Sequence, residues 1–157
     1  MKWFLIIIFV CFVLYIYTGL KQADKQGDWR RDVYNKNNIN FDDIKIRITD
    51  FNFGSEFIYL NDKRLFFVNA GVRLIKEIKK EDILQIDIEE TYEHKGKQKV
   101  VSLTPQMNIN SKLTMVSLKI ITEDGTYNVS PSTDLYKNRE RMIRLKAILE
   151  KRTKEVN

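Results

Sequence analysis

The sequence contains little cysteine, histidine, proline or glycine. Its 157 residues include one cysteine (Cys11), one histidine (His94), 2 prolines and 6 glycines. These single residues exclude a disulfide framework, a zinc site built from cysteine and histidine, and a Cys/His catalytic dyad within one soluble pocket. The chain also lacks the G-x-x-x-x-G-K-S/T, G-x-G-x-x-G and H-E-x-x-H motifs. The usual sequence signals of nucleotide binding and zincin chemistry are therefore missing.

Charged residues are nearly absent from the first 20 positions, where Lys2 is the one charged side chain. The run from Trp3 to Leu20 is uncharged and mostly apolar. As a helix it spans about 27 Å, close to the roughly 30 Å hydrocarbon core of a bilayer. The run predicts a transmembrane anchor over residues 1–20. A cleavable signal peptide is the alternative, although the residues that follow the run lack an A-x-A cleavage pattern.

Basic residues follow the apolar run more densely than they precede it. Lys21, Lys25, Arg30 and Arg31 come soon after it, whereas Lys2 precedes it. The positive-inside rule favours keeping the more basic side in the cytoplasm. The sequence therefore predicts a single-pass protein of the cell membrane with a cytoplasmic soluble domain.

Residues 21–40 are rich in Asn, Asp, Lys and Gln and have no apolar periodicity. This composition is typical of a juxtamembrane stalk. Arg30 and Arg31 are candidates for contact with anionic lipid headgroups, where each basic residue contributes about 1 kcal/mol. A solvated linker with two incidental arginines is an equally weighted interpretation.

After residue 42 apolar and polar residues alternate. Ile44, Ile46 and Ile48 are separated by charged residues, which is typical of a strand with one buried face. Further runs, separated by polar turns such as Asp124-Gly125, predict about seven or eight antiparallel strands. These runs lie at 43–49, 57–60, 65–68, 72–78, 83–89, 100–105, 115–122 and 127–129, with a charged hairpin tip at 92–99.

The end of the chain has helical periodicity instead. Leu135, Met142, Leu145 and Leu149 recur at helical spacing after the cap-type residues 130–134, which predicts an amphipathic helix of about 18 to 20 residues. The fold class is α+β, mostly β, with this helix covering the sheet. The expected core consists of Ile44, Ile46, Ile48, Phe66, Val68, Ile86, Ile88, Val101, Leu118, Ile120, Met142, Leu145 and Leu149.

Two stretches carry a resemblance to a known family: FIYLNDKRLFFVNAGVRLIKEIKKEDILQIDIEE, from Phe57 to Glu90, and VSLKIITEDGTYNV, from Val116 to Val129. In strand order the chain resembles the pleckstrin-homology-like (PH-like) superfold, especially the small PH-like and GRAM-type domains of bacterial membrane proteins. The resemblance implies a PH-like domain over residues 41–157, an antiparallel sheet or partly open barrel of about seven strands capped by one C-terminal helix. The chain lacks the Lys-x-Arg pair on the first hairpin that lipid-binding members carry, which argues against phosphoinositide binding.

Two groups of basic residues are candidate contact sites for lipid or a partner: Lys76, Lys79 and Lys80 before the step at Asp82, and the terminal-helix residues, among them Arg141 and Arg144. Glu140, Glu150 and Glu155 also lie on or beside that helix, so a solvated, ion-paired face is the main interpretation. Contact with anionic headgroups is the alternative. Nucleic acid is not an expected partner, because no aromatic residue interleaves with these basic residues.

These observations favour a non-enzymatic, membrane-anchored binding or scaffold protein that contacts a protein partner or an anionic membrane surface. We predict no catalytic residue, no cofactor and no metal ligand; His94 is expected at an exposed hairpin tip, where its replacement by Ala changes nothing. Two alternatives stay open. One is an exported or anchored hydrolase-type enzyme with a cleft beside residues 106–112, and the other is an extracytoplasmic structural subunit of an envelope assembly.

Overall fold

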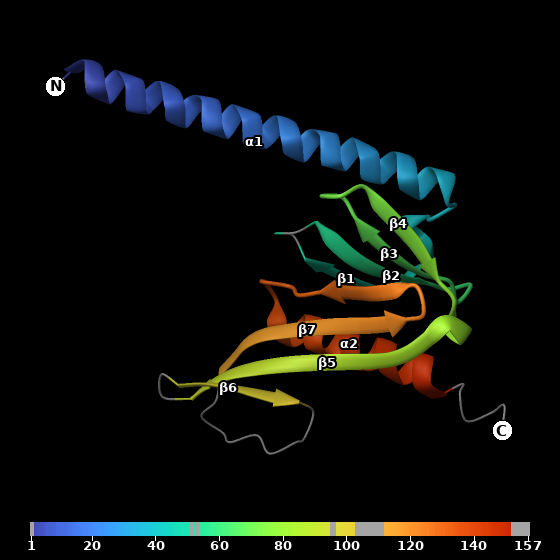
Figure 1. The fold of residues 1–157 in the computed structure, drawn as a ribbon. Helices are drawn as coiled ribbons and strands as arrows, with labels where there is room; N and C mark the ends of the chain where they lie inside the picture. Colours follow the sequence, from blue (N-terminus) through green and yellow to red (C-terminus); the bar gives the residue numbers. More distant parts are fainter. Residues whose placement is uncertain (1, 51, 53, 95–96, 103–111, 152–157) are drawn as a thin grey trace. The chain divides into compact units, whose positions relative to one another are not determined.

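The computed structural model describes residues 2–50, 52, 54–94, 97–102 and 112–151, which divide into two compact units, residues 1–38 and residues 39–157. The first unit is helix α1 (Lys2–Lys36) (Figure 1). The predicted helix over the apolar run is confirmed. Within the described chain, α1 has the length and apolar composition needed to cross a membrane, and a signal sequence meets the same criteria.

Helix α1 is longer than the sequence pattern indicated, because it continues through the predicted stalk to Lys36. The predicted stalk over residues 21–40 is therefore helical as far as Lys36. Lys, Gln, Arg and Ala are good helix formers, and a helix that has already nucleated gains a hydrogen bond for each residue it adds. The helix ends at asparagines: the backbone N–H of Asn37 donates to the carbonyl of Val33 (3.1 Å), and Asn38 has a left-handed φ of 52°.

The second unit begins with two antiparallel sheets (Figure 1). The first sheet has the order β1-β2-β3-β4, from β1 (Ile44–Asp50), β2 (Ser55–Leu60), β3 (Leu65–Asn69) and β4 (Leu74–Ile78). Its β2–β3 turn closes as predicted, with the backbone N–H of Leu60 donating to the carbonyl of Arg64 (2.9 Å). Short 3₁₀ turns, η1 (Phe41–Asp43) and η2 (Lys80–Asp82), precede β1 and β5.

The second sheet has the order β6-β5-β7-β8, from β5 (Ile83–His94), β6 (Lys97–Ser102), β7 (Lys112–Thr122) and β8 (Gly125–Val129). The prediction of a charged hairpin tip over 92–99 is wrong in extent, because Tyr92 pairs with Lys99 and His94 with Lys97. The backbone pairing of β5 with β6 therefore extends into the segment predicted as a tip. The tip itself, residues 95–96, and residues 103–111 lie outside the described residues.

Helix α2 (Leu135–Lys151) follows the strands and packs against β7, β1 and β5. Its first turn is tied to the preceding loop, since the backbone N–H of Asn138 donates to the carbonyl of Asp134 (2.9 Å) and the Asn138 side chain to that of Thr133 (2.9 Å). The mostly-β α+β class, with a C-terminal helix covering strands, is confirmed.

One hydrophobic core joins both sheets and α2. Most of the predicted members belong to it, and so do Phe57, Tyr59, Leu65, Phe67, Ile78, Val116 and Val129. Phe66 and Val68 are buried but outside this cluster, so their predicted placement is wrong. They alternate with Leu65 and Phe67 and therefore lie on the other face of β3. Ile44 is half-buried, and the side chain of Val101 lies outside the described residues.

The central strands of the first sheet are buried on both faces. Ile58 and Phe66 lie on the face opposite the core, each at most 1% exposed. The buried Glu56 on this face accepts a hydrogen bond from Nε of Arg47 (2.7 Å). This two-sided burial explains why β2 and β3 are continuous apolar runs in the sequence rather than alternating ones.

Candidate functional site

The basic residues predicted on the first unit, Arg30 and Arg31, are neighbours on α1. Arg31 lies 3.9 Å from the carboxylate of Asp28, one helical turn earlier, and both side chains are more than 70% exposed. An exposed pair of this kind contributes little to stability. Arg30 is less exposed than Arg31. The two side chains point in different directions, because successive helical residues are rotated by about 100°.

The predicted cluster of Lys76, Lys79 and Lys80 does not present three ammonium groups to one ligand. Nζ of Lys76, on β4, lies 2.5 Å from Oδ2 of Asp124 in the β7–β8 turn. This hydrogen bond and charge pairing raise the pKa of Lys76 and lower the pKa of Asp124. Lys79 is exposed at the start of η2, and Lys80 is half-buried within it.

The predicted α2 residues also differ from each other. Arg141 is half-buried and donates from Nη1 to the backbone carbonyl of Arg47 (3.2 Å), which ties α2 to β1. Arg144 is exposed and has no ion pair within the part of the chain that the structure describes. Of the five predicted contact residues on the second unit, Lys76 and Arg141 are held by partners within the chain, whereas Lys79 and Arg144 are exposed.

A polar cluster that the sequence analysis missed joins β5 to α2. Glu90, 4% exposed, accepts a hydrogen bond from Nε of Arg139 (2.7 Å) and another from the phenol of Tyr92 (2.5 Å). We call Glu90, Tyr92 and Arg139 the Glu90 cluster. Strand alternation places Glu90 on the same face as the core residues Ile86 and Ile88. This alternation is the sequence signal from which the burial of Glu90 could have been predicted.

The Glu90 cluster leads to a prediction about ionisation. Burial and the neighbouring Glu90 carboxylate raise the pKa of Tyr92, partly offset by Arg139. We expect Glu90→Gln to lower this pKa, because the neighbouring negative charge is removed. Ultraviolet titration of tyrosinate in both proteins, with Tyr92→Phe to assign the signal, measures the change.

The same shift determines how stability depends on pH. Because the folded-state pKa is raised, the stabilisation is complete below the ordinary tyrosine pKa of about 10 and disappears as pH rises through the folded-state value. The stability advantage of the native protein over Tyr92→Phe should therefore decline above pH of about 10. An identical Tyr92 titration in native protein and Glu90→Gln would contradict the assigned cause.

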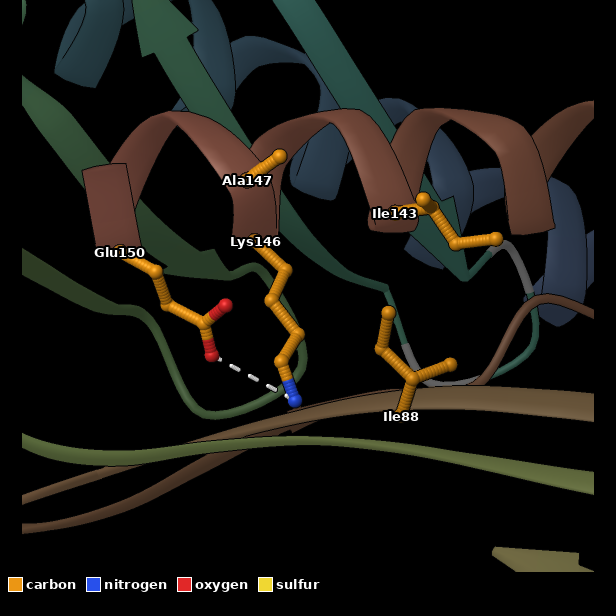
Figure 2. A pocket seen from close by; sticks show the side chains of 5 residues that line it. All are labelled: Ile88, Ile143, Lys146, Ala147 and Glu150. Carbon is orange, nitrogen blue, oxygen red and sulfur yellow. Dashed lines mark ion pairs between the residues drawn. The ribbon is translucent and has the colours of Figure 1, made fainter. Parts of the chain in front are cut away.

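A small hollow lies where α2 passes over β5. It has a volume of about 190 Å³ and is lined by Ile88, Ile143, Lys146, Ala147 and Glu150. Figure 2 shows Ile88 pointing from β5 toward Ile143 on α2, with Lys146 and Glu150 reaching toward the strand. Nζ of Lys146 lies 3.6 Å from Glu150 and donates to the carbonyl of Ile86 (2.8 Å).

The hollow is lined by one carboxylate, that of Glu150, and not by the two converging carboxylates that would indicate acid–base catalysis. In the described part of the chain, no three His, Cys, Asp or Glu side chains gather in a group that could hold a metal ion. The side chain of His94 lies outside the described part of the chain. So do residues 106–111, which make up most of the segment beside which the enzyme hypothesis placed its cleft. Comparison with known proteins adds no assignment, because no protein-family model, curated protein or solved structure matches this chain.

Proposed function

We propose that this chain is a non-enzymatic, single-pass membrane protein whose second unit is a PH-like binding module for a partner protein on the cytoplasmic side. The apolar part of α1 supports the anchor. The order of the eight antiparallel strands in the described part of the chain, followed by α2, supports the PH-like assignment. Lys21, Lys25, Arg30 and Arg31 after the apolar run support the cytoplasmic orientation.

The observation that carries this proposal is that several basic side chains form ion pairs and hydrogen bonds within the chain. Lys76 binds Asp124, Arg139 binds Glu90, and Lys146 binds Glu150 together with the carbonyl of Ile86. A domain that binds a bilayer by charge needs such groups directed toward the headgroups. A partner protein instead binds through shape complementarity and a small number of hydrogen bonds, and does not depend on an array of free basic groups.

The second candidate function is contact with an anionic membrane surface. Lys79 and Arg144 favour it, because both are exposed and neither has an ion pair among the described residues. Such contact is a weak supplement, since a tethered domain already lies close to the bilayer.

Cross-linking the full chain in intact cells tests the proposed function. We expect a membrane-permeant, lysine-reactive reagent to join the chain to a partner protein, while an impermeant reagent leaves it unjoined. The complex should persist after extraction at about 1 M salt, where the Debye length is about 3 Å. Adducts formed by the impermeant reagent would overturn the cytoplasmic orientation.

Vesicle co-sedimentation of residues 39–157 separates the two candidates, because this unit contains its own core. We expect weak binding to anionic vesicles at about 0.1 M salt and none at about 1 M. Lys79→Gln combined with Arg144→Gln should abolish the weak binding, whereas Lys76→Gln, which removes an already paired charge, should preserve most of it. Headgroup-selective binding that resists high salt, without a protein adduct in cells, would contradict the partner-protein function.

A further inference from the structure

An apolar row runs along the side of α2 that faces away from the core. It consists of Tyr136, Ile143 and Ala147, which follow one another at intervals of seven and four residues. Side chains at these intervals lie on the same side of a helix. Tyr136 is 57% exposed and Ile143 38% exposed, and Ala147 is exposed as well. The apolar row is therefore accessible to a ligand, whereas Leu145, two positions before Ala147, is buried in the core.

A basic row runs beside the apolar row. It consists of Lys137, Arg144 and Lys151, which recur every seven residues over about 21 Å of helix. Lys137 and Arg144 directly follow Tyr136 and Ile143, so the two rows are neighbours on the helix surface. All three basic side chains are exposed, and none has an ion pair among the residues that the structure describes.

The other three basic residues of α2 do not contribute to this row. Arg139 and Lys146 take part in ion pairs, and Arg141 donates to a backbone carbonyl of β1. Glu140 is exposed and lies between the two rows, as the rotation of about 100° per residue requires. Within the described chain, the solvent-facing side of α2 thus keeps three cations and one carboxylate outside ion pairs.

The apolar row continues into the hollow over β5, because Ile143 and Ala147 line it together with Ile88 (Figure 2). Its volume of about 190 Å³ is below the roughly 300–1,000 Å³ of pockets that hold drug-sized molecules. The partial exposure of Ile143 shows that the hollow opens to solvent beside the apolar row. These properties suit an aliphatic side chain that projects from a segment lying along α2.

The spacing and charge of the two rows indicate what kind of segment would bind. The backbone groups in the interior of a helix are bonded to each other, so α2 offers none to an extended strand. A second helix satisfies its own backbone, and its side chains meet rows that repeat every seven residues. Acidic side chains on that helix are attracted to the basic row, and basic ones are repelled.

Glu140 argues against the two other occupants of this surface. A flat anionic bilayer that contacts the basic row would also contact the Glu140 carboxylate, which the headgroups repel. A partner helix can place a neutral or basic side chain opposite this one position. Two copies of the chain that pair through α2 would place two basic rows of like charge in one interface.

We propose that the solvent-facing side of α2 docks an amphipathic helix of the partner protein. The apolar stripe of that helix lies on the apolar row, with one aliphatic side chain in the hollow, and its acidic side chains lie opposite the basic row. The apolar contact supplies affinity, and the basic row selects the charge of the partner. This inference rests on the proposed function and identifies where on the module the partner binds and what it presents.

Peptide binding to the full chain in nanodiscs of zwitterionic lipid tests this docking surface, with empty nanodiscs as the blank. The probe is a fluorescent, synthetic three-heptad peptide with Leu and Ala along one helical stripe, Glu beside that stripe and Gln elsewhere. We expect saturable binding above the blank by fluorescence anisotropy. A central Pro in the peptide should weaken binding at least about tenfold, because it breaks the helix. Replacing its Glu residues by Lys should weaken binding as well.

A charge reversal tests the basic row. Lys137→Glu combined with Arg144→Glu should weaken binding of the Glu peptide at least about tenfold and strengthen binding of the Lys peptide. Lys63→Glu combined with Arg73→Glu makes the same change in net charge at exposed hairpin turns and should alter both affinities less than about twofold. All four residues are exposed, so the native melting temperature should be retained.

Ala147→Arg tests the apolar row separately from charge. The variant adds a positive charge, which by itself favours the Glu peptide, but its long side chain covers the hollow and the apolar row. We expect binding to weaken about tenfold, because the clash exceeds the added attraction. Since Ala147 is exposed, this variant also keeps the native fold.

Several outcomes would overturn the docking surface. They are no saturable binding of the Glu peptide, equal effects of the two charge-reversal pairs, and native affinity in Ala147→Arg. A dimer in sedimentation that Ala147→Arg dissociates would assign α2 to a second copy, and binding of the basic row to anionic vesicles alone would assign it to the bilayer. In cells, a partner adduct that persists in Ala147→Arg would overturn the docking surface and leave the proposed function standing. Absence of every adduct in the native chain would overturn the function itself.

Discussion

Replacing Leu145 by Ala is expected to lower the free energy of unfolding of the second unit by about 2 to 5 kcal/mol. Leu145 is 1% exposed and belongs to the core that joins α2 to both sheets. The substitution removes buried methyl groups and leaves a cavity whose walls lose packing contacts. Urea denaturation of residues 39–157, followed by circular dichroism, measures the change.

Ile143 provides the matched control, because it lies on the same helix and is 38% exposed. Ile143→Ala should cost less than about 1 kcal/mol, since solvent already reaches the side chain. Equal losses in the two variants would show that α2 does not bury Leu145 in the core.

Replacing Arg139 by Ala is expected to destabilise the second unit by about 2 to 3 kcal/mol, somewhat less than the loss typical of a fully buried ion pair. The variant leaves the Glu90 carboxylate, whose side chain is 6% exposed, with the Tyr92 phenol as its neighbour. The Arg139 side chain keeps 24% exposure, which moderates the loss. Denaturant unfolding at neutral pH measures the effect.

A double variant separates the buried charge from the contact itself. Arg139→Met combined with Glu90→Leu should recover most of the lost stability, because no uncompensated charge remains inside the protein. Lys76→Ala breaks the exposed pair with Asp124 and should leave the unfolding transition close to that of the native chain. A double variant less stable than Arg139→Ala would contradict the explanation by buried charge.

Local patterns predicted most of the secondary structure correctly. Alternation around Ile46 and Ile48 located β1, the Asp124-Gly125 turn located the β7–β8 hairpin, and helical spacing of Met142, Leu145 and Leu149 located α2 and its buried face. Such signals depend on residues within a few positions of each other, so they can be read from the sequence. Where both faces of a strand are buried, as in β3, alternation disappears and the core face could not be assigned.

The sequence by itself determined the apolar run at the N-terminus, the strand-rich domain and its terminal helix, because apolar periodicity and turn residues act locally. The tertiary structure alone decided which charges pair and which backbone carbonyls bind side chains of α2. Glu90 and Arg139 are 49 residues apart, and Lys146 reaches Ile86 across 60 residues. Contacts at such separations depend on how α2 lies over β5, and no pattern within either segment encodes that placement. The hollow between β5 and α2 combines Ile88 with side chains from the other end of the domain, so it exists only once both sheets and α2 have packed around one core.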